Sequence, residues 1–183
     1  MRMSITLATT TTLLMLIAPA TIAQENENNT REGFWIGFGL GGGSSKAGDQ
    51  DPIEGGGAYL RMGGTINKKF LLGGEAIGWG RSENGVGLTR SNIALTGIFY
   101  PSETGGFYLK GGLGTAIVEF QIGGLKFSEN GGGATFGLGY EIGIGNNLVL
   151  VPAFDFFAQS FDQGGGNKQT STAALLTVGL TWH

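Results

Sequence analysis

The chain has 183 residues, among them 37 glycines, 12 phenylalanines and 4 prolines, and it has no cysteine. Without cysteine, no disulfide can brace the fold and no thiolate can bind a metal or attack a substrate. The net charge of −3 and the absence of a basic stripe argue against nucleic acid as a partner.

The first 23 residues have the pattern of a secretory signal peptide. Arg2 supplies a positive start, residues 13–18 are mostly apolar, and small residues follow at Ala20 and Ala23. The apolar stretch is too short to cross a bilayer as a helix. We therefore expect a cleaved signal peptide at 1–23, a flexible leader at 24–32 and one folded domain at 33–183. A buried N-terminal helix is the alternative.

Eight runs of alternating residue type follow the leader. They lie at about 33–42, 57–66, 70–80, 88–100, 107–119, 133–144, 148–160 and 170–182. High glycine content is typical of disordered chains, but here the glycines alternate with large apolar residues, which disordered chains lack. Alternating runs of about ten residues, separated by turn residues, are typical of transmembrane β-barrels.

The two faces of each run indicate which side meets water. In the first run Phe34, Ile36 and Phe38 share one face, while Trp35 and several glycines share the other. A soluble sandwich would expose a face rich in Lys, Glu and Thr. A glycine face cannot solubilise a surface, but it fits the crowded interior of a small barrel. The pattern therefore predicts an all-β, eight-stranded, antiparallel up-and-down transmembrane β-barrel. A soluble periplasmic barrel is the alternative.

The connections between the runs suggest an orientation. If the N-terminus is periplasmic, the connections that face outward centre on 43–56, 81–87, 120–132 and 161–169. The periplasmic connections centre on 67–69, 101–106 and 145–147, and they are shorter on average and rich in turn-forming residues. We expect long outward loops and short periplasmic turns, as outer-membrane barrels have.

Strand parity places six charged residues inside the barrel. They are Arg61, Glu75, Arg90, Lys110, Glu141 and Asp155. A buried charge without a partner costs several kcal/mol, so we expect these three cations and three anions to pair in a filled lumen. Structural polar packing is the preferred interpretation, and a gated ion path or ligand site is the alternative. By the same parity Trp35, Trp79 and Tyr108 point inward, although interfacial aromatic girdles remain an alternative for them.

Groups suited to catalysis or metal binding are scarce. His183 is the only histidine, and at the end of the chain we expect it to be a bystander, with no catalytic residue, cofactor or metal site elsewhere. Asp49, Asp51 and Glu54 lie close together in the first outward connection. A solvated acidic loop is the preferred interpretation, and a divalent cation bridging lipopolysaccharide phosphates is the alternative.

Two segments carry a family resemblance. The stretch from Tyr100-Pro101-Ser102 through Gly114 resembles the central hairpin of small outer-membrane β-barrel proteins of the OmpA and OmpX type. Leu175 to Trp182 is similar to the closing strand of that family. The resemblance implies that Leu180 and Trp182 belong to a recognition signal for the barrel assembly machinery, here followed by His183. It also implies a bacterial outer-membrane location, with membrane lipid and lipopolysaccharide as partners and no nucleic acid.

The resemblance leaves the function open, because one fold serves many tasks. We expect a non-enzymatic structural or surface-interaction role, with an external loop partner that the sequence does not identify. A narrow channel or conduit for small solutes is the alternative. A lipid-modifying enzyme ranks third, because the lipid-A-deacylating members of the family use a histidine and a serine on outer strands, and no internal match exists here.

Overall fold

The computed structural model describes residues 31–162 and 167–183, so the expected signal peptide at 1–23 and most of the leader lie outside the described residues. The strands are β1 (Phe34–Ala47), β2 (Ile53–Asn67), β3 (Phe70–Glu83), β4 (Val86–Phe99), β5 (Phe107–Ile122), β6 (Leu125–Tyr140), β7 (Ile142–Gly143), β8 (Leu148–Asp162) and β9 (Lys168–Trp182). Each pairs antiparallel with its neighbours. Within the described ranges, no helix is long and apolar enough to cross a membrane.

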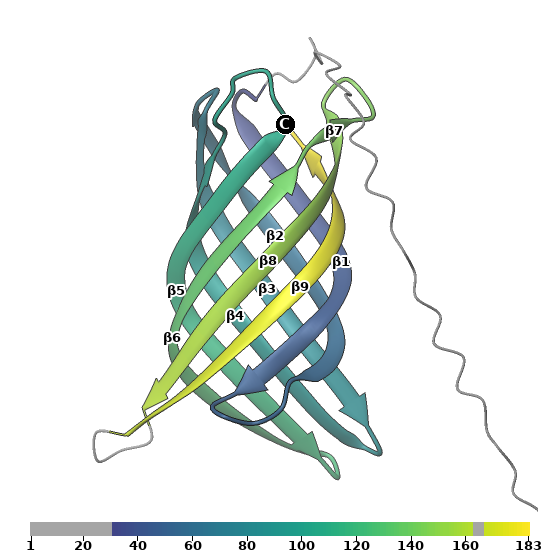
Figure 1. Cartoon of the computed structure of the whole chain (residues 1–183), viewed down its shortest axis with the longest axis vertical. Coiled ribbons are helices and arrows are strands. Elements are labelled where there is room, and N and C mark those ends of the chain that lie inside the picture. The colour runs from purple at the N-terminus through teal and green to yellow at the C-terminus, as the bar shows by residue number, and fades with distance from the viewer. Residues whose placement is uncertain (1–30, 163–166) are drawn as a thin grey trace, which may run out of the picture.

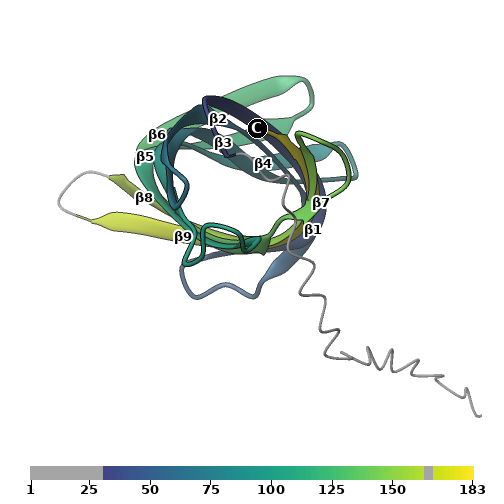
Figure 2. The ribbon, with the colours of Figure 1, turned by 90° about the horizontal axis from the view of Figure 1, so that it is seen from above.

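The strands close into one barrel. Their order is β6-β5-β4-β3-β2-β1-β9-β8, and pairing of β6 with β8 completes the ring, which is seen end-on in Figure 2. The two-residue β7 continues the line of β6 beyond Glu141 and also pairs with β8. Counting β6 and β7 as one strand, the wall of the barrel has eight strands. The predicted eight-stranded antiparallel barrel is confirmed. We call the end where β1 begins and β9 ends the inner end, and the opposite end the outer end (Figure 1).

The strands are longer at the outer end than expected. Residues 120–122 and 125–132, expected in a loop, belong to β5 and β6, and only Gly123–Gly124 turn between them. Likewise β3 and β4 are joined by Asn84–Gly85 alone. All four turn residues have positive φ, as the tight turns that match strand twist require. The connection between β4 and β5, at 100–106, lies at the inner end and is longer than either of these turns. The expected alternation of long outward and short periplasmic connections is therefore wrong.

The outer surface of the barrel is an apolar belt. Large apolar side chains point outward from all eight strands of the barrel wall, including Leu40, Leu113 and Leu176, each exposed by 70% or more. Trp182 belongs to this surface, with 60% exposure. The alternation that makes one face of each strand apolar therefore turns that face away from the barrel axis.

Many glycines that point inward are required by close packing. A Cβ atom added to Gly39 would lie 2.4 Å from Cε1 of Tyr59, whose ring fills the lumen beside it. A Cβ added to Gly114 would lie 1.9 Å from the carbonyl oxygen of Ile93 on the neighbouring strand. Glycine therefore lets neighbouring strands approach closely and leaves room for large side chains in the lumen, because an eight-stranded barrel has a small interior.

We predict that Gly39→Ala destabilises the barrel and that Gly64→Ala does not. The alanine methyl at position 39 must displace the Tyr59 ring, which typically costs about 1–3 kcal/mol, whereas a Cβ at Gly64 meets no atom within 4 Å. The free energy of unfolding, measured by urea titration in lipid vesicles, distinguishes the two. Equal stability of both variants would contradict the packing argument.

Candidate functional site

Four charged side chains meet in the middle of the lumen. Arg61 on β2 pairs in register with Glu75 on β3, and its Nε lies 2.6 Å from Glu75 Oε1. The Nη2 atom of Arg61 lies 2.6 Å from Oδ1 of Asp155 on β8. Lys110 on β5 joins both acids, with its Nζ 2.7 Å from Asp155 Oδ1 and also in contact with Glu75 Oε1. Because β3 and β8 lie on opposite sides of the ring, this central ion cluster crosses the lumen.

Neighbouring side chains complete the central ion cluster. Tyr108 accepts a hydrogen bond from Arg61 at 3.2 Å, and Thr177 donates one to Asp155 at 3.2 Å. The Arg61 guanidinium also stacks on the Tyr59 ring, 3.6 Å from its centroid, a favourable cation–π arrangement. All four charged side chains are at least 95% buried. Two cations thus balance two anions in a space that excludes water, as a buried charge network requires.

A second cluster closes the inner end around Glu141. Its Oε2 lies 3.1 Å from Arg31 Nε, and its Oε1 accepts a hydrogen bond from Tyr100 at 2.6 Å and lies 3.0 Å from Nε2 of His183. Arg31 stacks on the Tyr100 ring at 3.6 Å. We call these four residues the inner latch, because they join the segment before β1, the end of β9 and the long inner connection.

The inner latch differs from what the sequence suggested. His183, expected to be a bystander, is buried and contacts Glu141, so that expectation is wrong. Arg31 falls in the segment taken as a flexible leader, yet it is 1% exposed and donates to the backbone oxygens of Glu103 and Gly105. The sequence does offer one indication of this contact. An even number of strands brings the segment before the first strand and the segment after the last strand to the same side of the barrel.

Arg90 is buried but stands apart from both clusters. Its Nη1 donates to Ser45 Oγ at 2.8 Å, and among the described residues it forms no ion pair with a carboxylate. Of the six charged residues expected in the lumen, four meet in the central ion cluster. Glu141 pairs with Arg31, and Arg90 has no carboxylate partner among the described residues. Uncharged amides fill the level beside Arg90, where Gln159 donates to Asn92 at 2.8 Å.

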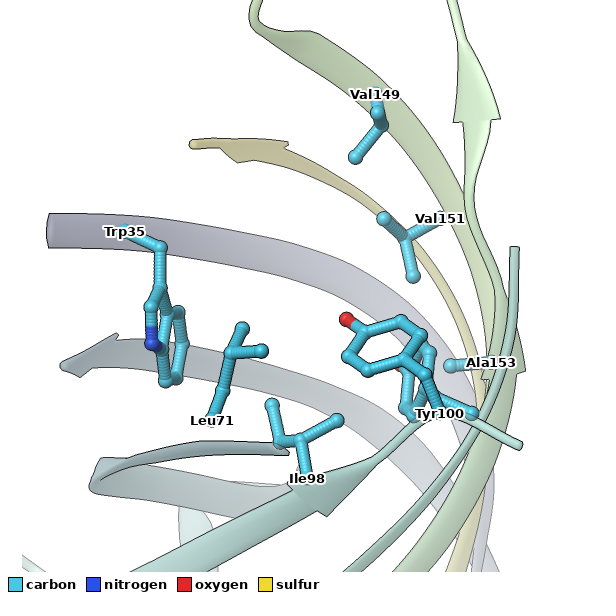
Figure 3. Packing of buried hydrophobic residues seen from close by; sticks show 8 residues of the cluster. Trp35, Leu71, Ile98, Tyr100, Val149, Val151 and Ala153 are labelled. Atoms are coloured by element: carbon cyan, nitrogen blue, oxygen red, sulfur yellow. The ribbon is translucent and has the colours of Figure 1, made fainter. Parts of the chain in front are cut away.

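Apolar layers separate these polar levels. Between the central ion cluster and the inner latch lies a cluster of Trp35, Leu71, Ile98, Tyr100, Tyr108, Val149, Val151 and Ala153, most of which Figure 3 labels. Toward the outer end lies a second cluster of Tyr59, Ile77, Trp79, Phe157, Ala173 and Leu175. The three aromatic residues of uncertain direction, Trp35, Trp79 and Tyr108, are thus buried in the lumen and form no girdle.

The buried carboxylates of the lumen are held in ion pairs. Within residues 31–162 and 167–183 no three His, Cys, Asp or Glu side chains converge to hold a metal ion. The acids Asp49 and Asp51 lie exposed in the connection after β1. The arrangement alternates apolar and ionic layers along the barrel axis, which makes the lumen a packed core.

Comparison with known proteins identifies the fold. The sequence matches no protein-family model, and no curated protein sequence is significantly similar to it. The structure resembles that of Neisserial surface protein A, with 12% identity, a TM-score of 0.65, and coverage of 82% of this chain and 97% of that one. It also resembles Ail, the attachment invasion locus protein of Yersinia pestis, with 16% identity, a TM-score of 0.56, and coverage of 82% and 99%. The chain therefore has the fold of small bacterial outer-membrane β-barrels.

We predict that Glu75→Ala lowers the free energy of unfolding by about 3–5 kcal/mol, because it leaves Arg61 and Lys110 with a single buried anion. Glu83→Ala is the matched control, since Glu83 pairs with Arg81 at the exposed outer end and such pairs contribute about 1 kcal/mol or less. Urea unfolding of both variants in vesicles measures the difference. A Glu75→Ala loss no larger than that of Glu83→Ala would remove Glu75 from a stabilising role.

We predict that Arg31→Ala opens the inner connection. It removes the hydrogen bonds from Arg31 to Glu141, Glu103 and Gly105, and charged hydrogen bonds contribute about 1.5–3 kcal/mol each. Amide hydrogen exchange in 100–106 should accelerate by about tenfold or more. Arg81→Ala, at the opposite end, should leave that exchange unchanged. Unaltered exchange in Arg31→Ala would show that the inner latch does not hold the connection.

Proposed function

We propose that the chain is an integral outer-membrane β-barrel with a non-enzymatic structural or surface-interaction role. The observation that carries the proposal is the combination of an apolar belt on the outside with a packed, charge-paired lumen on the inside. The apolar belt covers every strand of the barrel wall, so its area is far larger than that of the apolar patches that soluble monomers expose. A closed barrel also pairs its backbone groups between strands, which lets it cross hydrocarbon.

The packed lumen supports a scaffold over a conduit. A solute crossing the barrel would have to separate the ion pairs of Arg61 and Lys110 and then pass both apolar clusters. Removing one partner of a buried pair typically costs about 3–5 kcal/mol. An eight-stranded barrel has an interior wide enough only for side chains, and these side chains occupy it.

The outer end is the part of the barrel available to external partners. There β5 and β6 extend as a hairpin that carries an ion pair between Lys126 and Glu119. The hairpin of β3 and β4 carries the pair of Arg81 and Glu83. We therefore expect external partners to contact these strand extensions rather than long loops. The name of Ail describes attachment and invasion, and that likeness supports a surface-contact role without specifying a partner.

We also propose that the end of β9 serves assembly. Leu180 and Trp182 both point outward, and Trp182 is exposed. Trp182 pairs in register with Ile36 of β1 and Leu148 of β8, so this segment closes the ring. An aromatic residue at the end of the closing strand fits recognition by the barrel assembly machinery. His183, in contrast, is turned inward into the inner latch.

The test is conductance of the purified barrel in a planar bilayer. We expect no steady open level from the wild-type chain, and an increase in conductance for the charge-balanced quadruple variant Arg61→Ala, Glu75→Ala, Lys110→Ala, Asp155→Ala, which removes the whole central ion cluster. Heat-modifiable migration on gels establishes that each protein is folded. A steady open level in the wild-type chain would replace the scaffold with the conduit.

A further inference from the structure

Arg90 on β4 is a buried cation near the outer end of the lumen without an acid to balance it. Only 8% of the residue is exposed, and its Nη1 donates to Ser45 Oγ at 2.8 Å. Its Nε–H is buried and has no hydrogen-bond partner among the described residues. A guanidinium commonly holds a carboxylate through two parallel N–H···O bonds, and this N–H is available for one of them. Arg90 therefore lacks the compensation that a buried charge requires, and an anion from outside the chain would supply it.

The lumen is filled on the inner side of Arg90. Asn92, the next residue on the same face of β4, is fully buried and accepts a hydrogen bond from Gln159 at 2.8 Å. Trp79 of the second apolar cluster pairs with Arg90 in register. Glu75 of the central ion cluster pairs with Ala94, further along β4 toward the inner end. An anion would therefore reach the Arg90 guanidinium from the outer end.

The lumen side of β4, β5 and β6 is apolar between Arg90 and the outer end. Phe120 lies on the same face of β5 as the fully buried Ala116, because side chains two residues apart point to one side of a strand. Antiparallel pairing aligns two rows of apolar residues on this face, Leu88-Phe120-Phe127 and Val86-Ile122-Leu125. We call these six residues the outer apolar face. Arg90 lies at its base, in the next row inward, beside Val118.

The outer apolar face is exposed although it continues the lumen side of the strands. Phe127 and Leu125 are 59% and 63% exposed. The opposite face of the same hairpin carries Glu119, Gln121, Lys126 and Ser128. Lower in the barrel the apolar side of these strands points outward, so the two sides are exchanged in the projecting hairpin, which is drawn at the bottom of Figure 1. Contact with the membrane around the belt therefore does not explain this apolar face.

The size of the outer apolar face fits a small molecule. From Arg90 to Val86 the strand rises about 13 Å, at about 3.4 Å per residue, and three neighbouring strands span about 10 Å. A stable protein interface needs about 800 Å² on each partner, which is several times the area of this face. Small-molecule sites are mostly apolar and have a few placed polar groups, and here the polar group is the Arg90 guanidinium. Glu129 lies in the same row as Arg90 but two strands away, and it is exposed to solvent.

We propose that the outer end of the barrel binds a small amphiphilic carboxylate, of the class of medium-chain fatty acids. Its carboxylate pairs with Arg90, and its apolar chain lies on the outer apolar face. The uncompensated cation selects an anion over a neutral molecule, and the apolar rows select a chain over a small anion. This inference goes beyond the proposed function, because it needs only the folded barrel. The central ion cluster lies between this site and the inner end, so the ligand is held at the outer end.

The test is a titration of the purified barrel in detergent micelles with decanoate, followed by nuclear magnetic resonance. We expect a saturable shift of the Arg90 Nε–H signal and of the backbone amides at 118–127, and no shift of the Arg61 Nε–H signal. Acetate carries the charge without the chain, and decanol carries the chain without the charge, so each should bind about tenfold more weakly or worse. Binding of acetate or decanol as tight as that of decanoate would overturn the proposal, and so would a titration without any shift.

Variants assign the two parts of the site. Arg90→Met removes the cation and Phe127→Ser removes an exposed part of the apolar face, and each should weaken decanoate binding by about tenfold, as measured at the backbone amides. Arg81→Met and Lys126→Ser are the matched controls and should bind as the wild-type chain does. Arg81 already pairs with Glu83, and Lys126 lies on the opposite face of the hairpin.

Unchanged binding in Arg90→Met, or a loss of binding in Arg81→Met in its place, would overturn the carboxylate site. Heat-modifiable migration establishes that each variant is folded. Because Phe127 is exposed, Phe127→Ser tests the site even if Arg90→Met does not fold, and unchanged binding in Phe127→Ser would equally contradict the proposal.

Discussion

The structure depends on compensating charge inside a barrel whose outside is apolar. Because the belt faces hydrocarbon, the polar groups of the strands are left with the lumen, where little water can enter. Arg61, Glu75, Lys110 and Asp155 meet this constraint together, since each cation contacts both acids. The cluster connects β2, β3, β5 and β8 across the axis. It therefore joins opposite walls of the barrel across the lumen.

The remaining lumen residues are arranged around that cluster. Apolar clusters lie on either side of it, and they keep water from the ion pairs and strengthen them through a low local dielectric. At the inner end, Glu141 of the inner latch joins Arg31, which precedes β1, to His183, which follows β9. Glycine is the residue that makes this density possible, because aromatic rings such as Tyr59 lie directly on it. Gly64 on the outward face is the contrasting case, because a Cβ added there meets no atom within 4 Å.

Strand parity was enough to predict the barrel and to turn all six charged residues inward, because the side-chain period of a strand is strict. It could not assign partners, since these depend on height along the axis and on distance around the ring. Arg90 lies too close to the outer end to join the central cluster, and Arg31 precedes the first strand, where parity has no meaning. The outer hairpins differ from the expected loops for another reason. Asn84, Gly85 and the Gly123–Gly124 pair indicate loops by composition, but here they form tight turns between long strands.

Whether the four buried charges form one balanced cluster is tested by the energetic coupling between Lys110 and Asp155. The coupling is measured from urea unfolding of Lys110→Met, Asp155→Asn and the double variant in vesicles. Each single change leaves an excess buried charge, and the double change restores neutrality. We predict that the double variant is more stable than the sum of the single losses allows, with a coupling energy of about 0.5–3 kcal/mol. Strictly additive losses would contradict it, because the two residues would then not share one charge-balanced cluster.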